Sequence, residues 1–466
     1  MTRGFELSRA ALADLARGGA APATLAGLTG VERGKNALLL RAVVARSAAL
    51  GHPGARAAAD GYRLLARVQR SCPPAAAQVL GYPLIGTWAS ATLGALARQE
   101  QSAAPQRLAA VAAGAVVLAG AAITVRFPAE AGAVALPGVG RLPLPGLGAG
   151  EPVTLSPPYL VVGGERIMLP RDPRSATAGP WQAVRDLGTP GLETPGLGTS
   201  DLAAPDSGTP ALAAPDSGTR DRAAPDLGPP DTGLLLDDVD AWRFPGPIAP
   251  LDRLPDADAA AWAALITEAR AVLAAGHPAV ARALSAMTKV LVPITPPDSG
   301  TRSATSRTAY GSIAMSWPHD ARSAAVTLTH EVQHAKLAVL MDLFDLVRPG
   351  SGGRFYAPWR DDPRPAAALL QGAYAHMGVA GFWRAERHLA HDPAHAEFVR
   401  WRDAAREACL TLLGSGTVTA MGSRFIEGML ETLAAWRSER VPAEASAEAR
   451  QAATRHRALW SLRHGS

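Results

Sequence analysis

Residues 324–340 read AAVTLTHEVQHAKLAVL, and this stretch carries His330, Glu331 and His334 among mostly apolar neighbours. Its apolar residues recur at spacings of three and four, which is the period of a helix that packs against other elements. The stretch therefore predicts a long, mostly buried helix in the C-terminal half of the chain. The two histidines are four positions apart and are expected on one face of that helix.

Sequence signals mark the limits of this helix on both sides. Asp320 or Ser323 can cap its first turn, and the pair Pro349-Gly350 is expected to end it. Before it, residues 311–317 (GSIAMSW) have strand character and are followed by a proline. More helices are expected from Ala366 to the C-terminus.

The rest of the chain changes in texture along its length. Stretches rich in alanine and leucine, such as 36–50 and 61–69, predict helices, and residues 81–88 are expected to form a packed loop. Short apolar runs separated by glycine and proline predict strands between residues 123 and 169, and a further helix is expected at 256–275. The fold class predicted from this pattern is α+β, predominantly helical. The expected regions are a helical N-terminal region (1–122), a β-rich segment (123–185), a disordered low-complexity insertion (186–232) and a helical C-terminal region (233–466).

The predicted insertion contains a ten-residue repeat. The sequence AAPDSGT occurs at 203–209 and again at 213–219, and a decayed copy begins at Ala223. The repeat is rich in proline, glycine and polar residues, and it has no apolar anchors with which to build a core or a solenoid. We therefore expect it to affect the length of a loop and not the chemistry of the protein.

The composition excludes several classes of protein. The 46 basic residues are set against 41 acidic ones without a dense Lys/Arg block, so nucleic acid is not an expected partner. Cys72 and Cys409 are too few for a thiolate zinc cluster or a disulfide framework. No secretory signal is recognised at the N-terminus, and residues 108–125 are interpreted as a buried helix running into a strand rather than as a membrane span. A cytoplasmic protein without membrane partners is expected.

His330 and His334 belong to the pattern His-Glu-x-x-His. Because they lie one helical turn apart on the same face, their imidazoles can converge on one metal ion. Glu331 lies about 100° around the helix, from where its carboxylate can reach a water or a substrate on that ion, or can hydrogen-bond a ligand. Two packed core histidines are the alternative. We interpret the pattern as a metal centre, which makes 233–466 the catalytic region.

Two histidines leave a third ligand to be found. A metzincin would carry glycine and histidine where this chain has Leu337 and Leu340, so that class is excluded. The better candidate is His376, a polar residue in the apolar helical run 372–379 (GAYAHMGV), although a hydrogen-bonded core histidine would give the same pattern. Three histidines with open positions suit zinc and also non-haem Fe(II). A gluzincin would instead take a downstream glutamate, for which the candidates are Glu386, Glu397 and Glu427.

Four other histidines are expected to lie away from this centre. His388, His391 and His395 form a second cluster, which an Asp-Pro pair interrupts and polar residues surround. We interpret this cluster as an exposed helix end. His319 follows a Trp-Pro pair and is expected to face solvent.

Several segments of the C-terminal half occur together in a recognisable order. This set resembles the HEXXH-motif peptide-modification proteins found beside ribosomally synthesised peptide precursors and radical-SAM maturases. The resemblance is most specific between residues 311 and 384, extends to 83–89 and 234–243, and is interrupted by the insertion. The segments that carry it are 311–318, 330–337 (HEVQHAKL), 356–365 (YAPWRDDPRP), 372–379 and 382–384 (FWR).

The resemblance implies a peptide β-hydroxylase that depends on Fe(II), 2-oxoglutarate and O₂, and not a protease. The metal would be held by His330, His334 and His376. Glu331 would orient a ligand or the substrate without acting as a base. The substrate would be a side chain of a ribosomally synthesised precursor peptide, in a pathway shared with a radical-SAM maturase.

An enzyme of this type also needs a cation for the distal carboxylate of 2-oxoglutarate. The arginine guanidinium binds a carboxylate through two parallel hydrogen bonds. Arg360 and Arg364 lie in a loop stiffened by proline and tryptophan, between the long helix and His376. Either arginine is a candidate for this cofactor-binding role, and either could instead form a structural ion pair. Trp359 and Tyr356 are candidates for the walls of the same pocket.

Two other functions remain open. A zinc peptidase of the HEXXH type would use the same three ligands, with Glu331 as the general base that deprotonates a zinc-bound water. A metal-free protein that binds a leader peptide would be a degenerate member of the family, and the intact pair His330 and His334 argues against it.

Overall fold

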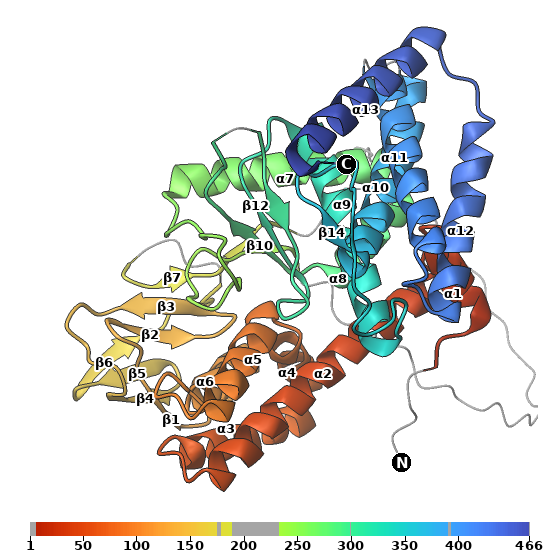
Figure 1. The fold of residues 1–466 in the computed structure, drawn as a ribbon. Coiled ribbons are helices and arrows are strands. Elements are labelled where there is room, and N and C mark those ends of the chain that lie inside the picture. The colour runs from red at the N-terminus through yellow and green to blue at the C-terminus, as the bar shows by residue number, and fades with distance from the viewer. Residues whose placement is uncertain (1–5, 175–178, 189–232, 299, 390–392, 466) are drawn as a thin grey trace, which may run out of the picture.

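The computed structural model describes residues 6–174, 179–188, 233–298, 300–389 and 393–465. Helices make up 56% of the described residues. Figure 1 shows the small sheets and most of the N-terminal helices on one side of the molecule and the C-terminal helices on the other. The predicted fold class, α+β and predominantly helical, is confirmed.

Helices fill the chain before the first described strand. Helix α6 is buried over ten of its 12 residues and leads to a strand, so the stretch 108–125 is a buried helix followed by a strand, as predicted. The expectation of a loop at 81–88 was wrong from Pro83 onward, because this proline has the fixed φ that suits the first turn of α5. The helices are α1 (Arg9–Ala16), α2 (Pro22–Ala49), α3 (Ala55–Ser71), α4 (Pro73–Leu80), α5 (Pro83–Ala97) and α6 (Arg107–Leu118).

Two antiparallel sheets follow. Their strand orders are β1-β4-β5-β6 and β2-β3-β7. The apolar run 159–169 forms a hairpin, because Gly163 and Gly164 both adopt positive φ and turn the chain between β5 and β6. The strands are β1 (Val125–Pro128), β2 (Ala133–Leu136), β3 (Gly140–Pro143), β4 (Pro152–Ser156), β5 (Tyr159–Val162), β6 (Glu165–Met168) and β7 (Gln182–Ala183).

A third sheet, of mixed direction, leads into the C-terminal half. Its strand order is β11-β12-β10-β9-β8, and β10 is parallel to both β9 and β12. Two helices connect β9 with β10, and the first of them is the helix expected at 256–275. The elements are β8 (Arg185–Asp186), β9 (Leu235–Leu236), α7 (Asp256–Gly276), α8 (Pro278–Met287), β10 (Val290–Pro293), β11 (Ser303–Ala304) and β12 (Ser312–Met315).

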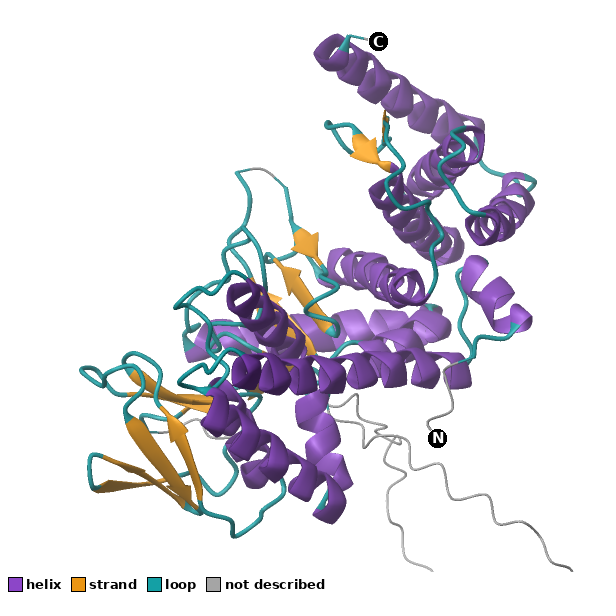
Figure 2. Ribbon diagram, turned by 60° about the horizontal axis from the view of Figure 1, so that its bottom comes forward, coloured by secondary structure: helices purple, strands orange, loops and turns teal. Residues whose placement is uncertain are grey.

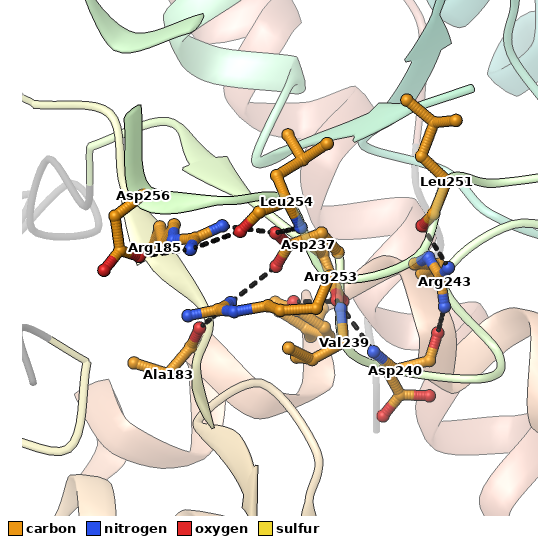
Figure 3. Close-up of polar contacts among 12 residues, drawn as sticks. Ala183, Arg185, Asp237, Val239, Asp240, Arg243, Leu251, Arg253, Leu254 and Asp256 are labelled. Carbon is orange, nitrogen blue, oxygen red and sulfur yellow. Dashed lines mark hydrogen bonds and ion pairs between the residues drawn. The ribbon is translucent and has the colours of Figure 1, made fainter. Parts of the chain in front are cut away.

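Two buried carboxylates directly after β9 tie the mixed sheet to its surroundings, as Figure 3 shows in part. Asp238 pairs with Arg185 and accepts a hydrogen bond from Arg253 at 2.6 Å. Asp237 accepts a hydrogen bond from the Tyr82 hydroxyl at 2.7 Å, and burial raises the pKa of Asp237 to about 6. These acids are fully engaged in joining the sheet to the N-terminal helices and the loop before α7.

The two ends of the insertion lie side by side. Strand β8 pairs antiparallel with β9, and the N–H of Leu187 donates to the carbonyl of Leu234 at 2.8 Å. The chain therefore leaves the fold and re-enters it at neighbouring backbone positions. The repeat itself falls within residues 189–232, which lie outside the described residues.

We expect residues 189–232 to be dispensable. A Cβ added to Gly233 would lie 3.0 Å from the backbone of Gly188, so a Gly/Ser linker of about six residues can join the two ends. The replacement should shift Tm by less than about 2 °C, measured by calorimetry, because the repeat cannot support a core. A scrambled segment of the same length is the control. A fall in Tm of about 10 °C or more would show that the segment is part of the folded core.

The predicted long helix is α9. Its N-cap is Asp320, one of the two expected caps, and 12 of its 23 residues are buried. It ends at Leu343, earlier than the expected stop at 349–350, because the backbone beyond it is extended and Val347 pairs with Val418. The elements from here to the C-terminus are α9 (Ala321–Leu343), β13 (Arg354–Phe355), β14 (Arg364–Pro365), α10 (Ala366–Glu386), a 3₁₀ turn (Arg387–Leu389), α11 (Ala394–Gly414), α12 (Ala420–Arg437) and α13 (Ala443–His464).

Helix α9 is covered on several sides. Helix α10 packs along it, and a second core joins α9 to α7, α8 and the mixed sheet. The approach of α10 is close, since a Cβ on Gly378 would lie 2.5 Å from the side chain of Gln333. Figure 2 shows the strands of the β-rich segment at one end of the molecule, with helices packed beside them and further helices beyond. The site described below therefore lies where helices from both ends of the chain surround α9.

Among the described residues, α7 is the one helix that could cross a membrane by length and composition alone. The pair α4 and α5 passes the same test only if it is counted as one span, despite a bend of 60°. Trp262, Ile266 and Leu273 of α7 are buried in the core shared with α9 and the mixed sheet. One face of α7 therefore packs in the core, and 28% of its apolar stretch is buried.

Candidate metal centre

The two histidines of α9 contact each other. The ring centroids of His330 and His334 are 4.6 Å apart, and their Nε2 atoms are 3.0 Å apart. Two nitrogen ligands on one ion, each about 2.1 Å from it and at roughly a right angle, would also lie about 3 Å apart. The two rings thus meet through the atoms that a metal ion would use.

A hydrogen bond fixes the orientation of His334. Its Nδ1 lies 3.0 Å from Oε1 of Gln371 on α10 and donates to it. A neutral imidazole carries one N–H, so Nε2 of His334 presents a lone pair, and the hydrogen between the two Nε2 atoms belongs to His330. Gln371 therefore has the position of the outer partner that metal-binding histidines commonly possess.

His376 reaches the same place from α10. Its ring centroid lies 5.0 Å from that of His330, and its Nδ1 donates to the carbonyl of Gly372 at 2.8 Å. This leaves Nε2 of His376 as a lone-pair donor. The ring is packed between the indoles of Trp359 and Trp401, whose centroids are 4.4 Å and 4.6 Å away. The imidazole is thus held in one orientation by contacts that do not occupy Nε2.

Trp359 reaches this position because residue 372 has no side chain. A Cβ added to Gly372 would lie 2.5 Å from the indole of Trp359. An alanine at this position would therefore push the indole away from His376.

Burial keeps two of the imidazoles uncharged. It lowers the pKa of His376 to about 3, and together with the neighbouring His334 and His376 it lowers the pKa of His330 well below its ordinary value. Part of His330 faces a cavity, but protein surrounds the rest of the ring. Because a metal binds the neutral imidazole, neither ring has to lose a charge at neutral pH, but His330 has to carry its hydrogen on Nδ1 for its Nε2 to bind.

Glu331 has one oxygen engaged and one without a partner. Its Oε1 accepts a hydrogen bond from Ser303 on β11 at 2.7 Å, whereas the buried Oε2 has no hydrogen-bond partner among the described residues. Burial is the largest cause of the raised pKa of Glu331, and His334 and the nearby hydroxyls of Ser303 and Thr305 partly offset it. A buried oxygen without a partner costs free energy, so this arrangement indicates a site that a ligand or a water completes.

A cavity of about 410 Å³ opens in front of these side chains, a size that suits a small molecule. Arg360 and Arg364 line it together with Arg307. The two oxygens of Asp362 accept hydrogen bonds from Arg360 at 2.9 Å and from Arg364 at 3.0 Å. Because one carboxylate is shared by two guanidiniums, positive charge remains beside the cavity. The cavity is also lined by His330, Glu331, His334 and His376.

The two candidate arginines are held differently. Arg364 belongs to β14, which pairs with β13 directly before α10, and its side chain is 34% exposed against 54% for Arg360. Arg364 is therefore the more fixed of the two. Trp359 lines the cavity as expected, but Tyr356 does not, because its hydroxyl hydrogen-bonds His456 of α13 at 2.8 Å.

The donor set fits a divalent ion of the zinc or iron type, with three imidazoles of which two are anchored through Nδ1. The arrangement is not that of a finished coordination sphere. Among the residues that the structure describes, no group of three or more His, Cys, Asp or Glu side chains is already placed to hold a metal ion. His330 and His334 are adjacent through Nε2, and His376 has to approach them to complete the set.

No protein-family model matches this sequence, and no curated protein matches it. The function proposed below therefore rests on the side chains of this site and on the sequence resemblance described above.

The glutamates considered as alternative ligands lie elsewhere. Glu386 is buried between His277 at 3.0 Å and Arg322 at 2.9 Å, so both of its oxygens are engaged. Glu397 accepts a hydrogen bond from a tryptophan N–H at 2.6 Å on α11. Glu427 is exposed on α12. His376 is therefore the candidate that the fold brings nearest to the pair on α9.

The other histidines that the structure describes do not line this cavity. His319 and His388 are exposed, as expected. His395 is half-buried at the beginning of α11, so the cluster is only partly exposed where it is described. His391 lies outside the described residues.

Sequence reasoning missed several residues of the site. Gln371 and Trp401 contact the histidines, Ser303 contacts Glu331, and Arg307 lines the cavity. Gln371 could have been found as a polar residue at the edge of an apolar helical run. The others come from strand β11, from the loop after it and from helix α11, and their places depend on tertiary packing that no local pattern encodes.

We expect His376→Ala to weaken binding of Fe(II) or Zn(II) by about a hundredfold or more, since one of three ligands is lost. The fold should persist, because Trp359 and Trp401 can close on a gap of one ring. His388→Ala, at an exposed histidine, is the matched control and should leave affinity unchanged. Anaerobic titration against a competing chelator measures both. Full affinity in His376→Ala would show that another residue completes the site.

Proposed function

We propose that this chain is an Fe(II)- and 2-oxoglutarate-dependent oxygenase that hydroxylates a side chain of a ribosomally synthesised peptide. The observation that carries the proposal is one cavity lined by three histidines and by the arginines of the 354–364 loop. His330, His334 and His376 would hold the metal ion. When bound, Fe(II) with 2-oxoglutarate and O₂ supplies the oxidation of a C–H bond to an alcohol, with release of succinate and CO₂.

Arg364 is the residue that we assign to the distal carboxylate of 2-oxoglutarate. It stands on a paired strand directly before the helix that carries His376, so the strand fixes its position relative to the metal ligands. In the absence of a ligand its partner is Asp362, which also binds Arg360. A dianion entering the cavity would exchange one carboxylate for another at Arg364, while Asp362 keeps its contact with Arg360.

Other side chains would orient and shield the reacting groups. Gln371 and the carbonyl of Gly372 hold His334 and His376 with Nε2 toward the site. Trp359 and Trp401 cover His376 on both sides and limit the access of water. In this proposal the free oxygen of Glu331 accepts a hydrogen bond from a bound water or from the substrate.

A zinc peptidase is the second candidate, and one observation favours it. Oε2 of Glu331 is buried beside the histidines without a partner among the described residues, and the pKa of this carboxyl is raised by burial. A general base of this kind could take a proton from a zinc-bound water. The arginines of the cavity favour the oxygenase, because they can bind the distal carboxylate of 2-oxoglutarate. Hydrolysis of a peptide bond needs no such cosubstrate.

The partners rest on the resemblance of the sequence to the HEXXH-motif peptide-modification proteins. The substrate would be a precursor peptide, and a radical-SAM maturase would act in the same pathway. We further propose that the protein works in the cytoplasm, where such peptides are made and where Fe(II) is available.

Binding of 2-oxoglutarate can be tested without the peptide. Anaerobic addition of 2-oxoglutarate to the Fe(II)-loaded chain should produce a charge-transfer absorption band in the visible range. Arg364→Gln should raise the Kd of 2-oxoglutarate at least about thirtyfold, because a charged hydrogen-bond partner is lost. Arg360→Gln, which is more exposed, is the matched control and should raise it less than about threefold.

Turnover with a precursor peptide then separates the two candidate functions. The oxygenase should add one oxygen atom to the peptide and form one succinate for each turnover, which mass spectrometry detects. A cleaved peptide without added oxygen, formed without 2-oxoglutarate, would support the zinc peptidase and contradict the oxygenase.

A further inference from the structure

A second cavity reaches the histidines from another direction. Its volume is about 650 Å³, and it lies between α9, α10 and α11. It shares Ser303, His330 and His376 with the first cavity, so the two cavities meet at the candidate metal centre. A small cosubstrate in the first cavity would leave the second one open to a larger molecule.

The walls of the second cavity combine aromatic rings with carboxylates. Trp383 of α10 and Trp401 of α11 supply the rings, and Asp320 and Glu397 supply the carboxylates. Trp401 already has a cation beside it, since the guanidinium of Arg400 lies 4.4 Å from its ring centroid. Aromatic faces and carboxylates together attract a cation more strongly than either does alone.

Two carboxylates and one guanidinium line this cavity, so its lining carries a net negative charge. Arg322 also lines it, but its Nε donates to the buried carboxylate of Glu386 at 2.9 Å, which offsets its charge. Glu397 accepts from Arg400 at 3.3 Å, through a guanidinium that does not line the cavity. Asp320 caps α9 through the N–H of Ser323, and this hydrogen bond together with the nearby Arg322 holds the pKa of Asp320 low, so its carboxylate stays ionised.

A buried histidine stands at the junction of the two cavities, and the nitrogen that the described residues leave open on it is the Nε2 assigned above to the metal ion. The side chain of His376 is more than nine-tenths buried, its Nδ1 is bound to a carbonyl, and Nε2 has no hydrogen bond to the protein among the described residues. The ring lines both cavities. The second cavity therefore ends at the candidate metal centre, and its walls carry the charges described above.

We propose that the second cavity binds a cationic side chain of a peptide, lysine or arginine, next to the position that is hydroxylated. The first cavity, lined by the arginines, then binds the anionic cosubstrate. The second cavity, lined by Asp320 and Glu397, binds the peptide substrate. The presence of a reaction centre beside this site rests on the proposed function, whereas the preference for a cation does not. Glu397 and Asp320 are the specificity residues of this proposal.

The experiment uses capped amino acids as probes for the full-length chain without metal. Nα-acetyl-lysine N-methylamide is compared by NMR titration with the norleucine and glutamate analogues, which have similar length but no charge or the opposite charge. Butylamine tests whether a cation is bound without a peptide. Titrations are repeated after loading with Zn(II), which reports on the metal site separately.

Two substitutions remove the charges and keep the local structure. Asparagine caps a helix as well as aspartate does, so Asp320→Asn should preserve α9, and Glu397→Gln keeps an acceptor for the N–H of Trp401. The combined variant should bind the lysine probe about tenfold more weakly and the norleucine probe equally well. The double variant Glu427→Gln/Glu431→Gln removes two charges from exposed carboxylates of α12; it is the charge-matched control and should change neither.

The outcomes are distinct for the two proposals. Preference for lysine over norleucine that disappears in the combined variant supports the cation site, even if no metal binds and the proposed function fails. Equal or weaker binding of the lysine probe, or a preference that survives both substitutions, overturns the cation site and leaves the metal centre standing. Binding of butylamine as strong as that of the lysine probe would overturn the peptide as its source.

Discussion

Alanine at His330 or at His334 is expected to abolish tight binding of a divalent metal ion. The two Nε2 atoms are 3.0 Å apart and belong to one turn of α9, so each ring supplies half of the pre-formed part of the site. Either substitution leaves one ring of α9 and His376 as the remaining ligands. These two cannot form a tight site alone, and the ring centroids of His330 and His376 are 5.0 Å apart. Metal analysis after anaerobic loading and desalting should give about one ion per chain for the wild type and almost none for either variant.

Loss of metal must be separated from loss of fold. Both histidines are half-buried and face a cavity, so truncation removes few packing contacts and Tm should fall by only a few degrees. His319→Ala, at an exposed histidine just before α9, is the matched control and should load normally. A stoichiometric ion in His330→Ala or His334→Ala would show that the metal, if any, binds elsewhere.

The local sequence carried enough information for the element that holds this pair. Asp320 has the short polar side chain that a helix N-terminus requires, and the apolar period after it demanded a buried helix. The end of α9 was predicted too late in the chain. After Leu343 the backbone is extended, Leu346 is buried and Val347 pairs with Val418. That pairing joins residues about 70 positions apart and leaves no local signal.

The same limit applies to the site. His376 could be suspected because it is a polar residue in an apolar helical run, and the fold brings it against His330. The contact between Ser303 and Glu331 depends on how β11 packs against α9, so the sequence could not show it. Glu386 is an example of the opposite error. The sequence made it a candidate metal ligand, but both of its oxygens are engaged by His277 and Arg322.

The C-terminal helix shows how a peripheral element supports the loop of Arg360 and Arg364. Tyr356 at the start of this loop hydrogen-bonds His456, and its ring lies 5.2 Å from that of Trp460. Further along the loop, the carbonyl of Asp361 is hydrogen-bonded by His464 at 2.6 Å. Helix α13 also packs along α11, where Ala449 is buried against Phe398 and Val399, so it joins α11 to this loop.

Replacing Glu331 by glutamine is expected to distinguish the two candidate mechanisms by their rates. A zinc peptidase that loses its general base should slow by about 10² to 10⁴, because that is the usual contribution of positioned proton transfer. An oxygenase in which this side chain only accepts hydrogen bonds should keep its rate of oxygen insertion within about tenfold of the wild type, since the amide oxygen can still accept. Mass spectrometry of the peptide product, with succinate measured in parallel, gives both rates.

The stability of the same variant tests whether Glu331 is retained for function. Burial raises its pKa above the unfolded value, so this carboxyl weakens the fold as pH rises through its folded pKa, and the amide removes that penalty. At pH 7 the metal-free Glu331→Gln chain should therefore melt at the same temperature as the wild type or higher. Glu386→Gln is the control, because it breaks a buried set with His277 and Arg322, and its Tm should fall by several degrees. A loss of stability in Glu331→Gln as large as that in Glu386→Gln would show that the Glu331 carboxylate stabilises the fold through its hydrogen bonds. Glu331 would then have no role in either mechanism.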